Sequence, residues 1–359
     1  MRRGIDYQNL SRDDLIYLLG VEDKAEIEEI YAEAYKTKLK YIGNQVFFRG
    51  LIEISNICRK NCYYCGIRSG NHNVHRFNLS EAEILKSARW AWEHQYASLA
   101  IQSGERDDAE FIDFVEAILL GIREFSGNDL GITLSCGEQT EETYQRWREA
   151  GASRYLLRIE TSNREFYRRL HPADHDYDKR LECLGRLRRT GYQVGTGVMS
   201  GLPGQTNEHL ADDIIFFKEH DIDMVGMGPW IPHFETPLGR AHPEIDNTRQ
   251  LEMGLKMIAL VRLYLKDVNI AATTALQALH PAGREMGLMA GANVIMPVIT
   301  ENEHRGDYVL YDGKPVCDEN AEGFRLALDK AILKLGEKVA YGNQGNSLHW
   351  QKRVGKQHG

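Results

Sequence analysis

The stretch "VFFRGLIEISNICRKNCYYCG" (residues 46–66) contains an apolar run that leads directly into three closely spaced cysteines. The run at 46–55 has the length and the β-branched and aromatic content of a buried strand. Cys58, Cys62 and Cys65 follow it, with three and then two residues between them. Three thiolates are one short of the four that a closed tetrahedral zinc site or a fully protein-ligated 4Fe-4S cluster needs. The stretch therefore predicts a strand followed by a loop with metal-binding chemistry and one open position.

Apolar runs of this kind recur along the chain, and each is followed by an amphipathic stretch. Ser80 and Glu83 form a capping box at the start of one such stretch, which has helical spacing of apolar residues. Eight strand-helix alternations predict an α/β fold, a complete (β/α)8 TIM-type barrel, with an open doubly wound sheet as the alternative. The expected strands are residues 46–55, 97–103, 130–136, 153–159, 192–200, 223–229, 269–274 and 292–297.

The barrel pattern occupies residues 46–300, with shorter segments on both sides. Residues 1–45 are rich in Leu, Ala, Glu and Lys, and Ser11 followed by Asp14 is a helix start signal, so we expect a helical extension there. Residues 301–359 should lie outside the barrel. They are expected to form a short capping segment, one helix near 320–338 and a loose polar tail.

Composition and charge argue against several classes of protein. With 42% hydrophobic residues, 27% charged residues and 9 prolines among 359 residues, the chain is typical of a globular protein with a large core. The formal charge of -8 argues against a nucleic-acid or anionic-membrane surface. No stretch has the roughly 18 consecutive apolar residues of a membrane span. Six cysteines, three of them within eight positions, indicate metal or redox chemistry in a reducing compartment, so a cytoplasmic location is expected.

Polar residues gather at the ends of the expected strands, where barrel enzymes collect their catalytic groups. These ends predict one shared cavity, although polar and glycine-rich residues are also common in ordinary loops. The ends concerned are Ser55 with the cysteines, "QSGE" (102–105), "TLSCGE" (133–138), "RIET" (158–161), "SGLPGQ" (200–205), "GPWIPH" (228–233) and "TTA" (273–275).

Three cysteines on one loop can hold a 4Fe-4S cube and leave its fourth iron without a protein ligand. That iron would be free to bind a small molecule, as in a reactive cluster rather than an electron-storage cluster. The alternatives are a zinc site completed by His72 or His75, and three unconnected buried thiols. The cluster is favoured because the loop follows the first barrel strand and no further CxxC pair occurs elsewhere in the sequence.

The spacing CxxxCxxC, with Tyr64 directly before the last cysteine, resembles the signature of radical S-adenosylmethionine (SAM) enzymes. A longer ordered set is similar to the HydE family of FeFe-hydrogenase maturases, over about residues 45–317. It consists of "EISNICRKNCYYCGIR", "QSGE", "RYLLRIETSN", "GLPGQT", "DMVGMGPWIPH" and "ATTA...GANVIMP".

The resemblance implies one 4Fe-4S cluster on Cys58, Cys62 and Cys65, whose open iron binds the amine and carboxylate of SAM. It implies one-electron cleavage of SAM to a 5'-deoxyadenosyl radical. The implied substrate is a small iron carbonyl cyanide or cysteine-bound precursor of the hydrogenase H-cluster. The implied partners are an electron-donor protein of ferredoxin or flavodoxin type and other hydrogenase maturases, with no nucleic acid and no membrane.

The resemblance also assigns residues around the cavity. Glu160 and Arg180 stand where the family's SAM-binding acid and base occur, although the two could form an internal salt bridge instead. The other residues expected around SAM are Tyr64, Gln102, Ser103, Gly104, Met199 and Met224. The expected substrate contacts are Thr133, Ser135, Arg158, Thr273, Thr274 and Tyr308. Threonine and methionine at such positions are also common in barrel cores. Tyr308 and Tyr311 resemble a segment that caps the barrel, with an ordinary surface strand as the alternative.

Two other functions share these features. Biotin synthase and methylornithine synthase have the same barrel and cysteine motif, and either would make the protein a sulfur-insertion or amino-acid enzyme. A non-catalytic metal-cluster scaffold would also need the cysteine loop.

Outside the cluster loop, the remaining cysteines argue against a second cluster. Many HydE sequences have a further cysteine set after the barrel. Here Cys317 occupies its first position, while Arg325 and Leu328 stand at the other two. Cys136 and Cys183 lie singly in apolar or helical contexts and are expected to be buried thiols.

Overall fold

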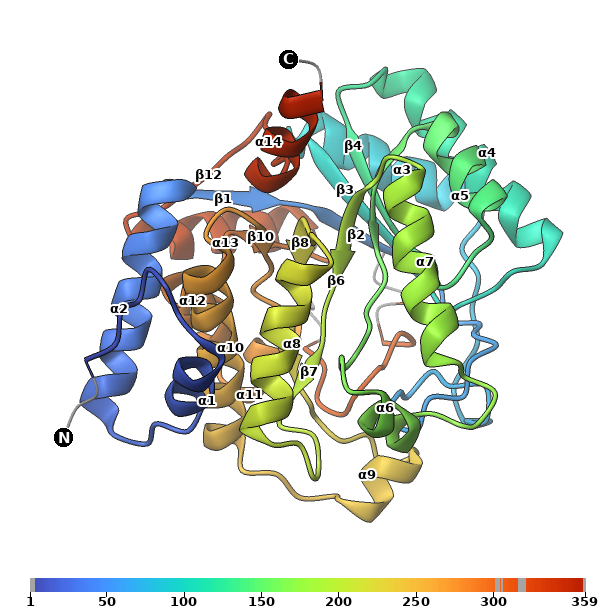
Figure 1. The fold of residues 1–359 in the computed structure, drawn as a ribbon. Helices are drawn as coiled ribbons and strands as arrows, with labels where there is room; N and C mark the ends of the chain where they lie inside the picture. Colours follow the sequence, from blue (N-terminus) through green and yellow to red (C-terminus); the bar gives the residue numbers. More distant parts are fainter. Residues whose placement is uncertain (1–3, 301–303, 305, 316–320, 358–359) are drawn as a thin grey trace.

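The computed structural model describes residues 4–300, 304, 306–315 and 321–357, and Figure 1 shows its ribbon. Seven parallel strands in this part of the chain form the main sheet, in the spatial order β10-β8-β6-β5-β4-β3-β2. The predicted α/β fold with parallel strands is confirmed. These strands are β2 (Gly50–Ser55), β3 (Ser98–Ser103), β4 (Gly131–Ser135), β5 (Ala152–Leu156), β6 (Gln193–Thr196), β8 (Met224–Val225) and β10 (Asn269–Ile270).

Three of the expected strands are divided in the structure. The shorter strands are β1 (Gln45–Phe48), β7 (Met199–Ser200), β9 (Gly228–Pro229), β11 (Val294–Ile295) and β12 (Lys338–Val339). Arg49 separates β1 from β2, because β1 pairs with β11 and β12 whereas β2 pairs with β3. Residues 192–200 and 223–229 are also divided, and β7 pairs with β9 in a separate ladder. The last two divisions lie beside Gly197 and Gly226. An added Cβ on Gly197 would be 1.9 Å from Gly226 O, so these two segments of the backbone approach too closely for a side chain between them.

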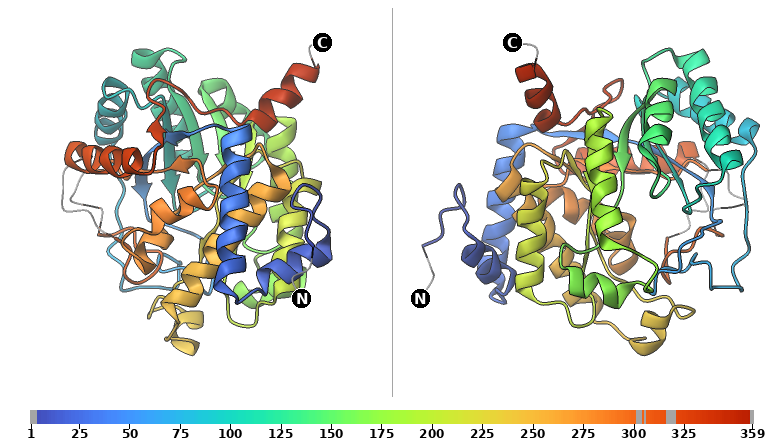
Figure 2. Two further views of the ribbon diagram at one scale, coloured as in Figure 1. Left: turned by 90° about the vertical axis from the view of Figure 1, so that its left-hand side faces the viewer. Right: turned by 45° about the vertical axis from the view of Figure 1, so that its right-hand side comes forward.

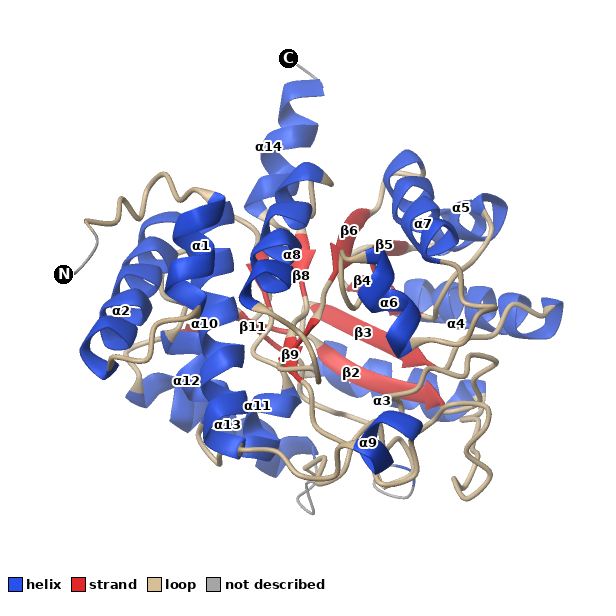
Figure 3. Ribbon diagram, turned by 60° about the horizontal axis from the view of Figure 1, so that its bottom comes forward, coloured by secondary structure: helices blue, strands red, loops and turns tan. Residues whose placement is uncertain are grey.

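The main sheet curls (Figure 3), and an isolated bridge connects each of its edges to the segment around β11: Ala271 pairs with Val294, and Leu51 pairs with Val298. On one side of β11, Ala272 N donates a hydrogen bond to Val294 O at 2.9 Å. On the other side, Phe47 N donates to Asn293 O at 2.9 Å. The inward faces of the strands therefore surround a common space.

Side-chain caps determine where several helices begin. The helices are α1 (Arg12–Leu19), α2 (Lys24–Tyr41), α3 (Glu81–Glu93), α4 (Ala109–Ser126), α5 (Glu141–Ala150), α6 (Arg164–Leu170), α7 (Tyr177–Arg189), α8 (Asn207–Glu219), α9 (Pro237–Ala241), α10 (Asn247–Leu265), α11 (Thr274–Leu279), α12 (Gly283–Met289), α13 (Ala321–Lys334) and α14 (Leu348–Gln357). Ser11 and Asp14 form a capping box at α1, and Ser80 and Glu83 form another at α3. Both predicted start signals are confirmed.

The N-terminal helices pack on the outside of the barrel helices, α1 against α8 and α2 against α10. Lys38 on α2 forms a buried ion pair with Glu337, just before β12. Burial lowers the pKa of Lys38 to about 8, against the opposing effect of Glu337. No helix in the described ranges is long and apolar enough to cross a membrane.

The C-terminal tail is docked on the barrel, so the expectation of a loose tail was wrong. Arg154 Nη2 donates to Gln344 O at 2.8 Å and to Asn346 Oδ1 at 2.5 Å, and Arg154 Nη1 donates to Ser98 Oγ at 3.2 Å. We call this end of the barrel, where residues 343–347 cover the amino ends of the strands, the closed end. Figure 2 shows α14 there, opposite α9. The tail is polar because it satisfies buried polar groups at the strand ends.

Candidate functional site

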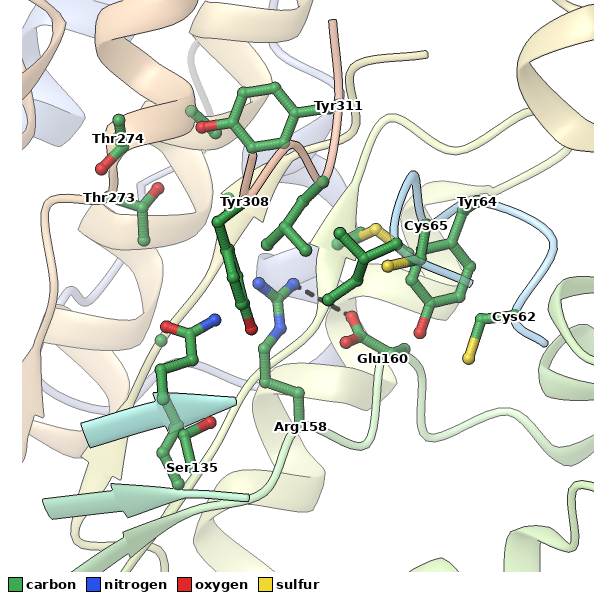
Figure 4. A pocket seen from close by; sticks show the side chains of 18 of the residues that line it. Cys62, Tyr64, Cys65, Ser135, Arg158, Glu160, Thr273, Thr274, Tyr308 and Tyr311 are labelled. Carbon is green, nitrogen blue, oxygen red and sulfur yellow. Dashed lines mark ion pairs between the residues drawn. The ribbon is translucent and has the colours of Figure 1, made fainter. Parts of the chain in front are cut away.

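A cavity of about 320 Å³ lies at the carboxyl ends of the strands, which we call the open end (Figure 4). It is lined by the loop after β2, by the ends of β3, β4 and β5, and by the C-terminal segment 308–314. The expected shared cavity is therefore present. Sixteen predicted residues line it: Cys58, Cys62, Tyr64, Cys65, Gln102, Ser103, Gly104, Ser135, Arg158, Glu160, Arg180, Met199, Thr273, Thr274, Tyr308 and Tyr311.

Cys58, Cys62 and Cys65 are free thiols on one wall of this cavity. Glu105 N donates a hydrogen bond to Cys58 Sγ at 3.3 Å. Burial raises the pKa of all three thiols, that of Cys62 to about 12, so metal binding must release their protons. A sheltered wall with a backbone N–H donor to sulfur suits thiolates that ligate an iron-sulfur cluster. The residues present therefore fit such a cluster.

A single metal ion fits this wall less well. No three His, Cys, Asp or Glu side chains among the described residues converge closely enough to hold one ion. The cysteines of a 4Fe-4S cube each bind a different iron, so their sulfurs stand farther apart than ligands around one ion. Of the two candidate zinc ligands, His72 is exposed and His75 has 73% of its side chain exposed, with Nδ1 3.0 Å from Asp307 Oδ2. This geometry favours the cluster over zinc.

Tyr64 closes the cavity beside the cysteines. Its hydroxyl lies 3.3 Å from His171 Nε2, and its ring packs with the apolar cluster that contains Met199 and Trp230. Burial lowers the pKa of His171 to about 3, so this imidazole is neutral at physiological pH. Tyr64 and Met199 thus form an uncharged, largely apolar part of the wall.

Glu160 and Arg158 form an ion pair at the end of β5 (Figure 4). Arg158 Nη2 lies 3.0 Å from Glu160 Oε2, but neither atom makes a hydrogen bond within the described ranges. Glu160 has a φ of 66°, a left-handed conformation that residues other than glycine rarely adopt. Glu160 N donates to Gly197 O at 3.0 Å and Met199 N donates to Glu160 O at 3.2 Å, which holds this backbone in place. The constrained backbone presents the carboxylate to the cavity.

Arg180 pairs with Glu138 and Glu105, so the alternative of a salt bridge between Glu160 and Arg180 was wrong. Arg180 Nε lies 2.8 Å from Glu138 Oε1, and Arg180 Nη2 lies 3.8 Å from Glu105 Oε2. Lys60 Nζ lies 2.9 Å and 3.3 Å from the same two carboxylates. Burial opposes the charge on Arg180, but Glu138 and Glu105 outweigh it and raise the pKa of Arg180. Two cations and two anions therefore meet at this wall.

Sequence reasoning missed several charged residues in the cavity wall and directly behind it. Glu105 and Glu138 each follow a glycine at the end of an expected strand, and this was the available signal. Lys314 Nζ lies 2.6 Å from Glu53 Oε1 and donates to Tyr308 O at 2.7 Å. No local pattern connects Glu53 and Lys314, because they meet only where the C-terminal segment returns over β2.

The segment 308–314 caps the barrel and is fixed to the cysteine loop. Gly66 N, next to the last cysteine, donates to Leu310 O at 2.9 Å. An added Cβ on Gly66 would lie 2.4 Å from His233 Cδ2, so only glycine allows this approach. Tyr308 is 1% exposed, as expected of a cap and not of a surface strand.

Thr133 and Met224 do not line the cavity, which corrects two expected contacts. Thr133 lies two residues before Ser135 on the same face of β4 and is therefore one layer deeper. Met224 Sδ accepts a hydrogen bond from Arg49 Nη1 at 3.1 Å in the interior. Both residues belong to the packed floor beneath the cavity.

Two of the other cysteines, Cys136 and Cys183, do not line this cavity. Cys136 and Cys183 are buried, as predicted. Cys317 lies outside the described residues. Arg325 and Leu328 stand at the two positions where a further cluster would need cysteine. Arg325 forms an ion pair with Glu322 at 2.6 Å, and Leu328 is buried.

Comparisons with known proteins agree with this geometry. Residues 52–217 match the Radical SAM superfamily. The [FeFe] hydrogenase maturase subunit HydE of Thermotoga maritima is 42% identical over 334 residues, covering 93% of each chain. The 3-methylornithine synthase of Methanosarcina acetivorans is 28% identical, over 84% of this chain and 83% of that protein. The crystal structure of methylornithine synthase (PylB) shares the fold, with a TM-score of 0.79 at 24% identity over 93% of this chain and 95% of that one.

Proposed function

Since this chain belongs to the HydE family of radical SAM enzymes, we propose that it acts on a small iron carbonyl cyanide or cysteine-bound precursor in FeFe-hydrogenase active-site assembly. It is a radical SAM enzyme with a 4Fe-4S cluster and SAM as cofactors. One observation carries the proposal. The cavity has the three-cysteine loop on one wall, and Thr273, Thr274 and Tyr308 on another (Figure 4).

Cys58, Cys62 and Cys65 would hold three irons of the cluster and leave the fourth to SAM. When bound, the cluster and SAM together supply one-electron cleavage of SAM to a 5'-deoxyadenosyl radical. The residues of the chain bind and orient the two reactants and keep water away from them.

Charged groups of the wall would hold the amino-acid end of SAM. Arg180 offers a guanidinium group to the SAM carboxylate, and Glu160 offers acceptors to charged or hydroxyl donors. The stretch from Gln102 through Ser103 to Gly104 would line the methionyl end. An added Cβ on Gly104 would lie 2.3 Å from Ile57 O, so this stretch packs directly against the cysteine loop. Tyr64 and Met199 would supply apolar contacts.

A small anionic guest suits the far side of the cavity. Arg158 Nε and Thr273 Oγ1 are buried without a hydrogen-bond partner within the part of the chain that the structure describes. Buried polar groups are normally satisfied, so a ligand with acceptor atoms would complete them. Ser135 and Thr274 add hydroxyls to the same lining, and Tyr308 closes it from the cap.

The finer architecture is also part of the proposal. Residues 46–300 would form a complete (β/α)8 barrel closed through β11, with a helical extension at 1–45 and a cap and tail at 301–359. The bridges Ala271–Val294 and Leu51–Val298, one at each edge of the main sheet, support closure. We place the enzyme in the cytoplasm, where its thiols stay reduced, with a ferredoxin or flavodoxin as electron donor and other hydrogenase maturases as partners.

Anaerobic turnover by the reconstituted enzyme tests the proposed function. Reduced enzyme with SAM alone should form 5'-deoxyadenosine slowly. A cysteine-bound iron carbonyl cyanide complex should accelerate SAM consumption and give an adenosyl adduct or a modified iron product, detected by mass spectrometry and electron paramagnetic resonance. If that complex has no effect while dethiobiotin or lysine stimulates turnover, the maturase proposal is wrong.

A further inference from the structure

A carboxyl group is buried behind the cavity wall, between α8 and the turn that follows β5. Asp213 on α8 has no exposed surface. Ser162 N and Ser162 Oγ both donate to Asp213 Oδ1, each at 2.6 Å. Ser162 stands two residues after Glu160, whose carboxylate is in the cavity wall (Figure 4). The side chain of Asp213 therefore bonds α8 directly to the turn that carries Glu160.

This turn has a backbone conformation that needs support. The φ of Glu160 is 66°, which glycine adopts freely and a residue with a Cβ does not. Such a conformation persists only where the surrounding structure holds it. A glutamate at this position indicates that the place of its side chain matters more than the comfort of its backbone.

Hydrogen bonds hold the turn on both sides of the strained residue. The backbone of Glu160 itself is bonded to the segment after β6, as described above. Beyond it, the hydroxyl of Tyr177 donates to Ser162 O at 2.8 Å, while Asp213 accepts from the N–H and the hydroxyl of Ser162. Ser162 is thus fixed through its N–H, its carbonyl and its side chain.

Core packing does not explain an aspartate at this position of α8. The other buried side chains of the helix are apolar: Leu210, Ala211, Ile214, Phe216 and Phe217. Burial raises the pKa of Asp213 to about 7, against the effect of the bonds from Ser162. Burying a carboxyl group costs stability unless its acceptor atoms are used. The contribution of Asp213 is therefore its pair of bonds to Ser162.

We propose that Asp213 is a positioning residue for SAM binding, because through Ser162 it holds the strained turn that presents the Glu160 carboxylate to SAM. The inference rests on the proposed function, which assigns Glu160 to the SAM site. Asp213 does not line the cavity, so it acts through Glu160 and not by contact with SAM. Without this acceptor the turn would relax, and the carboxylate would lose its fixed place beside Arg158.

Isothermal titration calorimetry of the cluster-loaded enzyme with SAM tests this inference. Asp213→Ala should weaken SAM binding about tenfold, because the Glu160 carboxylate loses its fixed orientation. Asp213→Asn keeps an acceptor for Ser162, and its affinity should stay within about threefold of wild type. The control is Asp212→Ala, which removes the neighbouring exposed carboxylate that pairs with Arg12 at 2.6 Å and should leave the affinity unchanged.

A double-mutant cycle shows whether the effect passes through Glu160. Glu160→Ala alone should weaken SAM binding about thirtyfold. The double variant Asp213→Ala/Glu160→Ala should bind SAM as Glu160→Ala does, because no carboxylate is left to position. A side chain that only stabilised the fold would instead weaken binding by the same factor in both backgrounds.

Hydrogen exchange of the cluster-loaded enzyme without SAM reports on the turn directly. The amide of Ser162 should exchange about tenfold faster in Asp213→Ala than in wild type, and at nearly the wild-type rate in Asp213→Asn. Mass spectrometry of peptides that contain residues 160–163 measures the rates. If Asp213→Ala does not fold, Ser162→Ala replaces it. This variant loses the hydroxyl bond alone and should weaken SAM binding about threefold.

Unchanged SAM affinity in Asp213→Ala would overturn the inference, and so would a loss that is equally large in the Glu160→Ala background. An equal loss in Asp213→Asn or in Asp212→Ala would also overturn it, since the bonds to Ser162 would not be the cause. If Glu160→Ala binds SAM like the wild type, Glu160 is no SAM contact and the inference falls with that assignment. If all variants behave as expected but the iron carbonyl cyanide complex does not stimulate turnover, the proposed function fails while the role of Asp213 stands.

Discussion

Two arginines four residues apart in the sequence show how the two ends of the barrel differ. Arg154, at the closed end, is fully buried and donates to three acceptors from β3 and residues 343–347. Arg158, at the open end, keeps 31% of its side chain exposed and has Glu160 as its ion-pair partner. At the closed end the chain itself supplies acceptors for both terminal nitrogens of Arg154, whereas at the open end Arg158 Nε and Nη2 have no hydrogen-bond partner among the described residues. The same side chain thus contributes to stability at one end and to binding at the other.

The largest change is expected when the cysteines of the open end are removed. The variant Cys58→Ala/Cys62→Ala/Cys65→Ala should bind no iron, because no other thiolate set replaces the loop. Its melting temperature should stay close to that of the metal-free wild type, because the closed end is intact. Anaerobic iron and sulfide analysis measures the effect, and Cys183→Ala serves as the control that keeps its iron. Iron that persists in the triple variant would mean that another cluster site exists.

The next largest effect is expected for Arg180, also at the open end. Arg180→Ala should weaken SAM binding about a hundredfold, roughly 3 kcal/mol, because a desolvated carboxylate loses its guanidinium partner. Isothermal titration calorimetry of the cluster-loaded protein measures the affinity. Arg180→Lys keeps the positive charge but not the planar pair of donors. Its affinity for SAM should therefore lie between those of the wild type and Arg180→Ala. An unchanged affinity in Arg180→Ala would assign Arg180 to the ion pairs with Glu138 and Glu105 alone.

Arg154 and Arg158 should differ when both are replaced by methionine. Arg154→Met should lower the free energy of unfolding by about 2 kcal/mol, because three acceptors, one buried and two part-buried, lose their donor. Arg158→Met should change it by less than about 0.5 kcal/mol, since Arg158 makes one ion pair and is partly exposed. Denaturant titration of both variants makes the comparison. If both variants lost the same free energy of unfolding, the two ends of the barrel would not differ in what they contribute to stability.

Much of the open end was predictable because its signals are local. The cysteine loop, "QSGE" and the end of β5 at Glu160 are contiguous stretches, and parallel strands bring their carboxyl ends together whatever lies between. It was harder to predict how deep in the barrel each inward side chain lies. Thr133 was expected in the cavity although the strand period places it below Ser135.

The closed end was poorly predicted because its contacts are distant in the sequence. Residues 343–347 are polar and lack periodicity, so they were expected to be loose, and no local pattern shows that Arg154 is their partner. The ion pair of Glu53 and Lys314 was missed for the same reason, because the two residues are far apart in the sequence. The division of strands at Gly197 depends on how closely two backbone segments approach each other, and amino-acid composition does not reveal this distance.

The smallest effect is expected from one histidine that fastens α14 to the closed end. His349 Nε2 lies 2.6 Å from Asp221 Oδ1, and His349 Nδ1 lies 3.2 Å from Asp267 Oδ1. Asp267 and then Asp221 raise the pKa of His349 above 6.5, against the effect of burial. A raised pKa means that the folded state holds this proton more tightly, so the stabilisation is complete below the unfolded pKa and is lost as pH rises through the folded pKa.

The consequence is measurable as a pH-dependent difference between two proteins. The gap in melting temperature between wild type and His349→Gln should be largest near about pH 6 and shrink toward about pH 8. Thermal unfolding at several pH values checks this. A gap that does not change with pH would show that the pair with Asp267 and Asp221 does not depend on the charge of His349.

The docking of residues 343–347 also has a consequence for the newborn chain. Synthesis runs from the amino end, so every strand of the main sheet has left the ribosome before the segment that covers the closed end is made. Until then Arg154 lacks its partners from residues 343–347, and water can reach the interior from the amino ends of the strands. The cap at 308–314, which completes the cavity, also emerges after the whole sheet. A nascent chain therefore carries its cysteine loop beside an incomplete cavity until residues 308–314 and 343–347 have both emerged.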